Sequence, residues 1–204
     1  MEASSGTCEI AQLPEEILSA LLALTTPRDA CRAAAACRDF RGAADSDAVW
    51  SRFMPRGELS GSPASSGKGR FLRLCDRPVL LADGLTSMWL DREGGAKCYM
   101  LSARQLNIAW GDTPHYWSWI PIQGSSRFTE AAQLNSVWWL EIRGKIDSKR
   151  QRADGWMEVE MGEFQNDEGE DGEVSIKLME TSATVKSGLI VQGIEIRPKK
   201  LLSL

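Results

Sequence analysis

The chain has 204 residues, of which 43% are apolar and 25% are charged, and its formal net charge is -4. This length and composition suit a globular protein with two small cores, and the negative charge disfavours binding to a nucleic-acid backbone. The sequence contains no run of eighteen apolar residues and does not open with a basic stretch followed by an apolar one. We therefore expect neither a membrane span nor a secretion signal, and we expect the protein in the cytoplasm or the nucleus.

Side chains for metal binding or covalent catalysis are sparse. The five cysteines form no CxxC pair, so we expect reduced thiols. The sole histidine, His115, has no cysteine or second histidine at ligand spacing and lies in an aromatic stretch, which favours a structural role. The acidic run EFQNDEGEDGE (163–173) lacks the ligand pattern of a calcium-binding EF-hand loop. We expect no catalytic residue, no metal and no cofactor.

Residues 1–12 are expected to be disordered, and residues 13–56 are predicted to form a small helical module. The segment LPEE (13–16) is a helix start, because proline suits the first turn and the acids favour the helix dipole. The apolar residues that follow repeat at spacings of four, four and three and form one helical face: Leu13, Ile17, Leu21 and Leu24.

Three more helices complete the predicted module. Thr26 can cap the second helix by accepting a hydrogen bond from the Asp29 amide, and the alanines at 33–36 favour helix. Further helical pieces are predicted around 40–44 and 49–53. About forty residues bury too little area to be robust alone, so a module of this size often completes its core against a partner. Its apolar face is an interface candidate.

The Gly- and Ser-rich segment 57–69 is predicted to be a flexible linker to a β domain spanning 70–204. There the apolar period changes to two, and turn signals separate the alternating segments, which suggests an antiparallel sandwich or jelly roll. The exception is residues 128–134, where we allow for a single helical turn. The alternating residues are Leu106, Ile108 and Trp110; Trp138, Leu140 and Ile142; Met157, Val159 and Met161; Val174, Ile176 and Leu178.

The helical module resembles the F-box, whose pattern combines Leu-Pro, short helices, a Cys before the third helix and a terminal Trp. The matching residues are Leu13, Pro14, Ile17, Leu18, Asp29, Cys37, Phe40 and Trp50. F-boxes dock on a Skp-type adaptor, and through it on a cullin, in SCF (Skp, cullin, F-box) ubiquitin ligases. The resemblance implies that the adaptor-facing residues are Leu13, Pro14, Ile17, Leu18 and Leu21.

The remainder resembles the phloem-protein-two (Nictaba-like) lectins of plants, in the subgroup with an F-box in front. Six blocks in order carry the likeness: FLRLCDRPVLL, MWLDREGGAKCYMLSARQLNIAWGDTPHYWSW, RFTEAAQLNSVWWLEIRGKI, DGWMEVEMGEF, GEDGEVSIKLME and KSGLIVQGIEIRP. A relative in this family binds chitin oligomers and N-glycan cores through one Trp and two Glu. The resemblance implies that Trp110, Glu173 and Glu180 bind carbohydrate.

This chain departs from the family pattern near 146–154, where a few tens of residues with central strands are missing. A sandwich without inner strands exposes backbone edges and apolar faces. The two glutamates also pose a geometric problem: seven positions on one straight strand separate them by roughly 23 Å and put them on opposite sides, so a shared pocket needs a bend. The sequence also gives no sign of the paired carboxylates of a glycosidase.

The eight tryptophans suggest sugar stacking, because the apolar face of a pyranose packs against an indole. Trp110 is a candidate platform, although alternation with Leu106 and Ile108 would turn it inward. Core packing is expected for Trp117, Trp119, Trp138 and Trp139.

Our hypothesis is an α+β, non-catalytic substrate receptor of an SCF-type ubiquitin ligase, with an F-box followed by a shortened β-sandwich that binds a glycan or glycoprotein. Two alternatives stay open: a lectin without a ligase role, and a truncated decoy that only occupies the adaptor.

Overall fold

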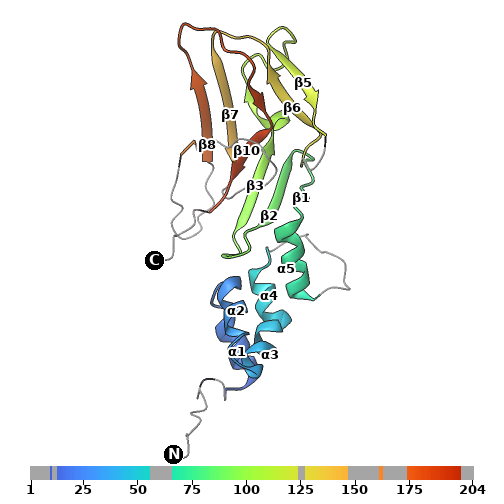
Figure 1. Cartoon of the computed structure of the whole chain (residues 1–204), viewed down its shortest axis with the longest axis vertical. Coiled ribbons are helices and arrows are strands. Elements are labelled where there is room, and N and C mark those ends of the chain that lie inside the picture. The colour runs from blue at the N-terminus through green and yellow to red at the C-terminus, as the bar shows by residue number, and fades with distance from the viewer. Residues whose placement is uncertain are drawn as a thin grey trace, which may run out of the picture. The chain divides into compact units, whose positions relative to one another are not determined.

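The computed structural model describes residues 10, 13–55, 66–123, 127–146, 161–162 and 174–198. The chain divides into two compact units, one comprising Met1–Arg77 with Leu90–Ala96 and the other Pro78–Trp89 with Lys97–Leu204. The described part of the first unit is mainly helical, and that of the second consists mostly of antiparallel strands (Figure 1). The predicted α+β class is therefore confirmed. No helix within the described ranges is long and apolar enough to cross a bilayer.

Short, capped helices build the first unit. Thr26 caps the second helix as predicted, since its Oγ1 accepts a hydrogen bond from the Asp29 amide at 3.1 Å. Ser46 and Ser66 cap two of the others in the same way, by accepting from the amides of Ala48 and Gly69. The helices are α1 (Glu15–Leu22), α2 (Pro27–Ala33), α3 (Arg38–Asp45), α4 (Asp47–Phe53) and α5 (Gly67–Asp76).

The core of this unit depends on α5, which we did not predict. Trp50 of α4 and Phe71 of α5 are fully buried, with ring centroids 5.2 Å apart, and the Trp50 Nε1 donates to the Ala44 carbonyl at 2.6 Å. The described residues 66–77 thus belong to the helical unit, whereas our prediction ran the linker to residue 69 and began the β domain at 70. Residues 56–65 lie outside the described residues.

The strands of the second unit form three antiparallel sheets, with the orders β1-β2-β3-β10, β4-β7-β8 and β5-β6-β9. One turn of 3-10 helix, Ala103–Gln105, follows β3. The strands are β1 (Val79–Leu80), β2 (Thr86–Leu90), β3 (Lys97–Ser102), β4 (Asn107–Ile108), β5 (Trp117–Pro121), β6 (Glu130–Leu134), β7 (Leu140–Ile146), β8 (Val174–Glu180), β9 (Ile190–Val191) and β10 (Gly193–Ile196).

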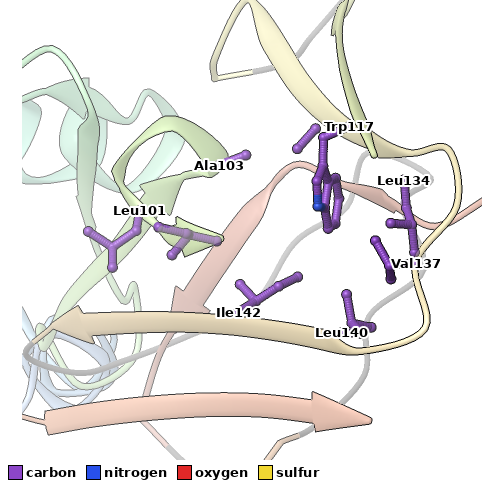
Figure 2. Close-up of a cluster of buried hydrophobic side chains, with 9 residues drawn as sticks. Leu101, Ala103, Trp117, Leu134, Val137, Leu140 and Ile142 are labelled. Carbon is purple, nitrogen blue, oxygen red and sulfur yellow. The ribbon is translucent and has the colours of Figure 1, made fainter. Parts of the chain in front are cut away.

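All three sheets contribute to the main apolar cluster. Figure 2 shows Leu101 of β3, Trp117 of β5, Leu134 of β6 and Ile142 of β7 converging on a shared interior. Burial of these side chains drives the association of the sheets. A second cluster, formed by Trp89, Cys98, Met100 and Phe128, lies elsewhere in the described structure.

The structure departs from the strand prediction at residues 128–134. The helical turn suggested for residues 128–134 is wrong, because residues 130–134 form β6 and pair with β5 and β9. Ala131, Ala132 and Leu134 are buried, so side chains on both faces of β6 are covered, as suits a strand with a neighbour on each side. Met157 and Val159, which we predicted to lie in a strand, are outside the described residues.

Candidate functional site

The α1 helix divides its apolar residues between the protein interior and solvent. Leu18 and Leu22, four residues apart, are buried, with Leu18 only 1% exposed. Ile17 and Leu21 are 48% and 47% exposed, and Leu13 and Leu24 are exposed as well. The apolar stripe on the helix is therefore wider than its own unit covers, and an outward strip remains uncovered.

The five residues that the F-box resemblance assigns to the adaptor do not share one environment. Leu13, Pro14, Ile17 and Leu21 lie on the surface. Leu18 belongs to the interior of the helical unit, next to Ser19, whose hydroxyl donates to the Ala43 carbonyl at 3.2 Å. A side chain this deeply buried packs the helix onto its own unit and is not accessible to a partner. The uncovered strip is hereafter the α1 face, defined by Leu13, Ile17, Leu21 and Leu24.

In the β unit, Trp110 lies on the surface although alternation predicted it to point inward. Strand β4 ends at Ile108, and the next amide, that of Ala109, still donates to the Glu141 carbonyl of β7 at 2.9 Å. Trp110 then takes a positive φ of 57°, which ends the extended path. The indole is 47% exposed.

Two inward-facing tryptophans of β5 donate hydrogen bonds to this turn. The Trp117 Nε1 donates to the Ala109 carbonyl at 3.1 Å, and the Trp119 Nε1 donates to the Gly111 carbonyl at 3.3 Å. Trp117 is buried, as expected, and Trp119 is partly buried and packs against the main apolar cluster. Buried indoles need an acceptor for their N–H, and here these acceptors are the carbonyls on either side of Trp110. The core thereby holds Trp110 outward.

Glu180 lies at the same end of the sheet as Trp110. It is the last residue of β8 and pairs with Leu140, the first residue of β7, while β4 pairs with the other edge of β7. Ile108, the last residue of β4, pairs with Ile142, which pairs with Leu178 of β8, so these β4 and β8 positions are two strand spacings, about 10 Å, apart. The Glu180 carboxylate accepts from the Ser182 amide at 2.7 Å. This bond is the main reason that the pKa of Glu180 lies below its ordinary value, and the carboxylate is ionised at neutral pH.

The third residue of the predicted set, Glu173, lies outside the described residues. Its neighbour Val174 begins β8 and pairs with Ile146, at the end of the sheet away from Glu180. The pairing runs through seven consecutive residue pairs without a bulge, and the two strands lie side by side in Figure 1. Within the described strand, therefore, the bend that a shared glutamate pocket requires is not found.

Sequence reasoning missed Trp138 and Trp139, for which core packing was wrong. They are 66% and 47% exposed. Val137 is buried and pairs with Lys186, so the next residue faces outward, and β7 begins only at Leu140. The Trp139 ring stands edge-on to Trp110, with centroids 6.0 Å apart, and Trp110 lies 5.8 Å from Tyr116. The signal that could have found one of them is the doubled tryptophan, since adjacent residues on a strand cannot both face one core.

A shallow pocket adjoins this aromatic surface. Its volume is about 370 Å³, and Trp138, Trp139 and the segment 181–183 line it. The Lys186 ammonium donates to the carbonyls of Trp138 and Ser182, at 2.8 Å and 2.6 Å, and so ties the two sides of the pocket together. We call it the Trp138 pocket. Among the described residues, no group of three His, Cys, Asp or Glu side chains could hold a metal ion.

Comparison with known proteins accounts for both units. An F-box-like family model matches residues 10–56, and a Phloem protein 2 family model matches residues 96–150 and 147–198. Putative F-box protein PP2-B12 of Arabidopsis thaliana is 37% identical over 93% of this chain and 98% of its own. F-box protein PP2-B10 of the same plant is 35% identical over 93% of this chain and 94% of its own. Putative F-box protein PP2-B2, also of Arabidopsis thaliana, is 33% identical over 97% of this chain and 86% of its own.

The comparisons also report the departure near the β7–β8 connection. The Phloem protein 2 match is split into two pieces that meet at residues 147–150. The alignment with PP2-B12 has 248 positions but covers 93% of 204 residues, which is about 190, so about 58 positions have no residue in this chain. The likeness otherwise extends through both units. The chain belongs to the phloem protein 2 group of plant F-box proteins.

Proposed function

We propose that this protein is the substrate-recognition subunit of an SCF-type ubiquitin ligase, in which the α1 face docks on a Skp-type adaptor and the β unit binds a glycan on the target. The protein performs no covalent chemistry in this scheme. Its contribution is proximity, because it holds an acceptor lysine near a conjugating enzyme supplied by other subunits.

The observation that carries the docking proposal is the exposure of the α1 face. Its helical unit already has a core, built on Trp50, Phe71 and Leu18, so the uncovered strip is not required for folding. Covering a half-exposed leucine or isoleucine contributes about 1 kcal/mol, so Ile17 and Leu21 on α1 and Leu13 and Leu24 beyond its two ends would together contribute about 4 kcal/mol to a contact. An amphipathic helix with an uncovered apolar strip is a common docking element.

The test is Ile17→Asp, assayed by co-purification of the full chain with a Skp-type adaptor. Docking would bury an unpaired charge, so we expect adaptor recovery to fall at least tenfold while the melting temperature stays within about 2 °C of wild type, because the residue is exposed in the free protein. Leu80→Asp is the matched control, since it places the same charge on an exposed leucine of β1. Unchanged recovery with Ile17→Asp would discard the docking proposal.

The glycan part of the proposal is supported by Trp110 and Glu180. The exposed indole offers a flat apolar face for a pyranose ring, and the ionised carboxylate accepts hydrogen bonds from sugar hydroxyls. Membership of a family with lectin members points the same way. The resemblance also adds Glu173, but its neighbour Val174 pairs with Ile146 at the end of β8 away from Glu180, so the proposed site is confined to Trp110 and Glu180. The aromatic surface also favours the second candidate function, a lectin without a ligase role.

A glycan array tests the carbohydrate function, and comparison with the docking result separates the two candidates. We expect retention of N-acetylglucosamine oligomers by the wild type and loss of that retention in Trp110→Ala. Trp89→Ala is not a suitable control because Trp89 is buried, so Leu80→Ala serves as the surface control. If the wild type retains glycans and plants carrying Ile17→Asp keep the biological activity of the wild-type protein, the lectin without a ligase role is favoured. A blank array would remove the glycan proposal.

A further inference from the structure

Strand β8 is the last strand of its sheet. The sheet has the order β4-β7-β8, and within the described residues β8 pairs with β7 alone, so its other side is an edge (Figure 1). The edge is long and straight, since all seven residues of β8 pair with β7 without a bulge. A strand of this kind presents a row of backbone donors and acceptors to which another strand can add.

The inner face of β8 extends beyond the core that covers β7. Leu178 pairs with Ile142, which is only 1% exposed, so the two side chains point to the same, inner side of the sheet. Val174 and Ile176 follow on that side because side chains alternate along a strand. Leu178 is nevertheless 37% exposed, and Val174 and Ile176 are only half-buried. Three apolar side chains at the edge therefore remain partly in water.

The break in the family match lies beside this edge. Strand β7 ends at Ile146 and β8 begins at Val174, and the two pieces of the Phloem protein 2 match meet between them, at residues 147–150. The edge therefore lies where this chain differs from its relatives, so its occupant need not be one that the relatives share.

The charge that would ordinarily protect such an edge is engaged within the sheet. Natural edge strands are commonly blocked by a proline, a bulge or a lysine. Strand β8 contains no proline, and Lys177 is its only basic residue. The Lys177 Nζ lies 3.0 Å from the Glu141 Oε1 of β7, so the ammonium is drawn toward its own sheet and away from the edge. Glu180 points to the inner side but occupies the last position of the strand.

The sequence of β8 fits a second copy of itself in one register. A two-fold axis through an antiparallel pair places one residue opposite its own copy. An axis at Lys177 would oppose two like charges, and an axis at Leu178 would place the terminal glutamate opposite Ile176. An axis at Ile176 instead places Val174 opposite Leu178 on the inner face. It also places Ser175 opposite Lys177 on the outer face. This register matches apolar side chains with each other and opposes no like charges.

We propose that two copies of this protein associate through the free edges of β8, paired antiparallel about Ile176, so that their two three-stranded sheets become one continuous sheet. The pairing covers the three apolar side chains and gives the backbone groups of the edge their partners. The dimer presents two α1 faces and two Trp110 surfaces, which strengthens the hold on a target with two attachment points. The association requires neither sugar nor adaptor, so it stands or fails apart from the proposed function.

Sedimentation velocity of the full chain without ligand, at about 1 to 100 μM, tests the pairing. Two short strand segments make a smaller interface than the standard of about 1,200–2,000 Å², so we expect a monomer–dimer equilibrium with a micromolar dissociation constant. Ser175→Glu places a carboxylate opposite Lys177 of the second copy, twice in each dimer, and should strengthen the association about fivefold. Ser175→Lys opposes like charges at the same places and should weaken it about fivefold.

The matched controls are Ser187→Glu and Ser187→Lys, which place the same charges on an exposed serine outside β8 and should leave the dissociation constant unchanged. Ser175 is exposed as well, so all four variants should melt as the wild type does at low concentration.

Opposite shifts in the two Ser175 variants, with none in the Ser187 variants, would support the pairing. A wild type that stays monomeric over the whole concentration range would overturn it. A dimer that responds in the same direction to both Ser175 variants, or to neither, would overturn it too, because the association would then use another surface or register. Assemblies that keep growing with concentration would be a further contrary result, since one edge per copy closes the pair.

Discussion

Replacement of Trp117 by phenylalanine should weaken both the β unit and the presentation of Trp110. The indole is 2% exposed, and its Nε1 donates to the Ala109 carbonyl at 3.1 Å. Phenylalanine cannot donate, so the carbonyl loses its partner at a cost of about 1–3 kcal/mol. The smaller ring also leaves a cavity, and the total should stay below the 3–5 kcal/mol typical of truncation to alanine. We expect a loss of about 2–4 kcal/mol.

Two measurements check this prediction. Thermal unfolding should show a fall in melting temperature on the order of 10 °C. Amide hydrogen exchange should show faster exchange at Gly111 and Thr113, whose amides donate to the Ile108 and Trp110 carbonyls within the turn. The second measurement needs no ligand, so it remains informative whatever the protein binds.

Trp89→Phe is the matched control for Trp117→Phe. Trp89 is also buried, but it belongs to the second apolar cluster, where its ring packs against the Arg127 guanidinium at 3.9 Å. It should lower the melting temperature without accelerating exchange at Gly111 and Thr113. If both variants left exchange in the turn unchanged, the idea that Trp117 holds Trp110 outward would be refuted.

Three further predictions address stability. Gly193→Ala would place a Cβ 1.9 Å from the Leu101 carbonyl oxygen, so it should lower the free energy of unfolding in urea by at least about 3 kcal/mol. Gly84→Ala, at a φ of 66° in open space, should cost only about 1–2 kcal/mol. Equal losses for the two variants would contradict this. Leu18→Ala should cost about 2–5 kcal/mol and Ile17→Ala under about 0.5 kcal/mol, because only Leu18 is buried; similar denaturation midpoints would be the contrary result. Hydrogen bonds from Lys177 and then from Arg143 hold the pKa of Glu141 below its ordinary value of 4.5. The stabilisation from the ionised Glu141 carboxylate is therefore present above that pH and is lost as the pH falls. Glu141→Gln should flatten the plot of stability against pH below about pH 4.5, and parallel plots for variant and wild type would argue against this.

The helical unit was largely predictable because its signals are local. The Thr26 cap and the four-residue apolar spacing in α1 depend on residues within one or two turns, and both are seen in the structure. The α5 helix escaped prediction because its first turn contains Gly67 and Gly69, which resemble the glycine-rich linker before them. What identifies it is tertiary contact between Phe71 and Trp50, which a periodicity argument does not include.

The aromatic surface was harder to predict because its orientation is set by distant partners. Alternation with Leu106 and Ile108 would turn Trp110 inward, and it points outward because β4 ends after Ile108 and the indoles of β5 capture the turn. Trp138 was assigned to the core because it alternates with Leu140 and Ile142, but pairing of Val137 with Lys186 sets its direction. In each case a pair of hydrogen bonds to residues distant in the sequence or on another strand overrides the local period.

The strand pairing also bears on whether a shortened domain can keep its binding surface. The break in the family match falls at residues 147–150, directly after β7 ends at Ile146. The residues proposed to bind sugar lie at the other end of β7, where Leu140 pairs with Glu180. Six strand steps separate the two ends, a distance of about 20 Å. Between them the seven β7–β8 pairs are continuous, and Leu140 and Ile142 are buried in the main apolar cluster. The missing segment is thus separated from the proposed sugar site by a paired and packed strand, and this favours a functional receptor over a decoy.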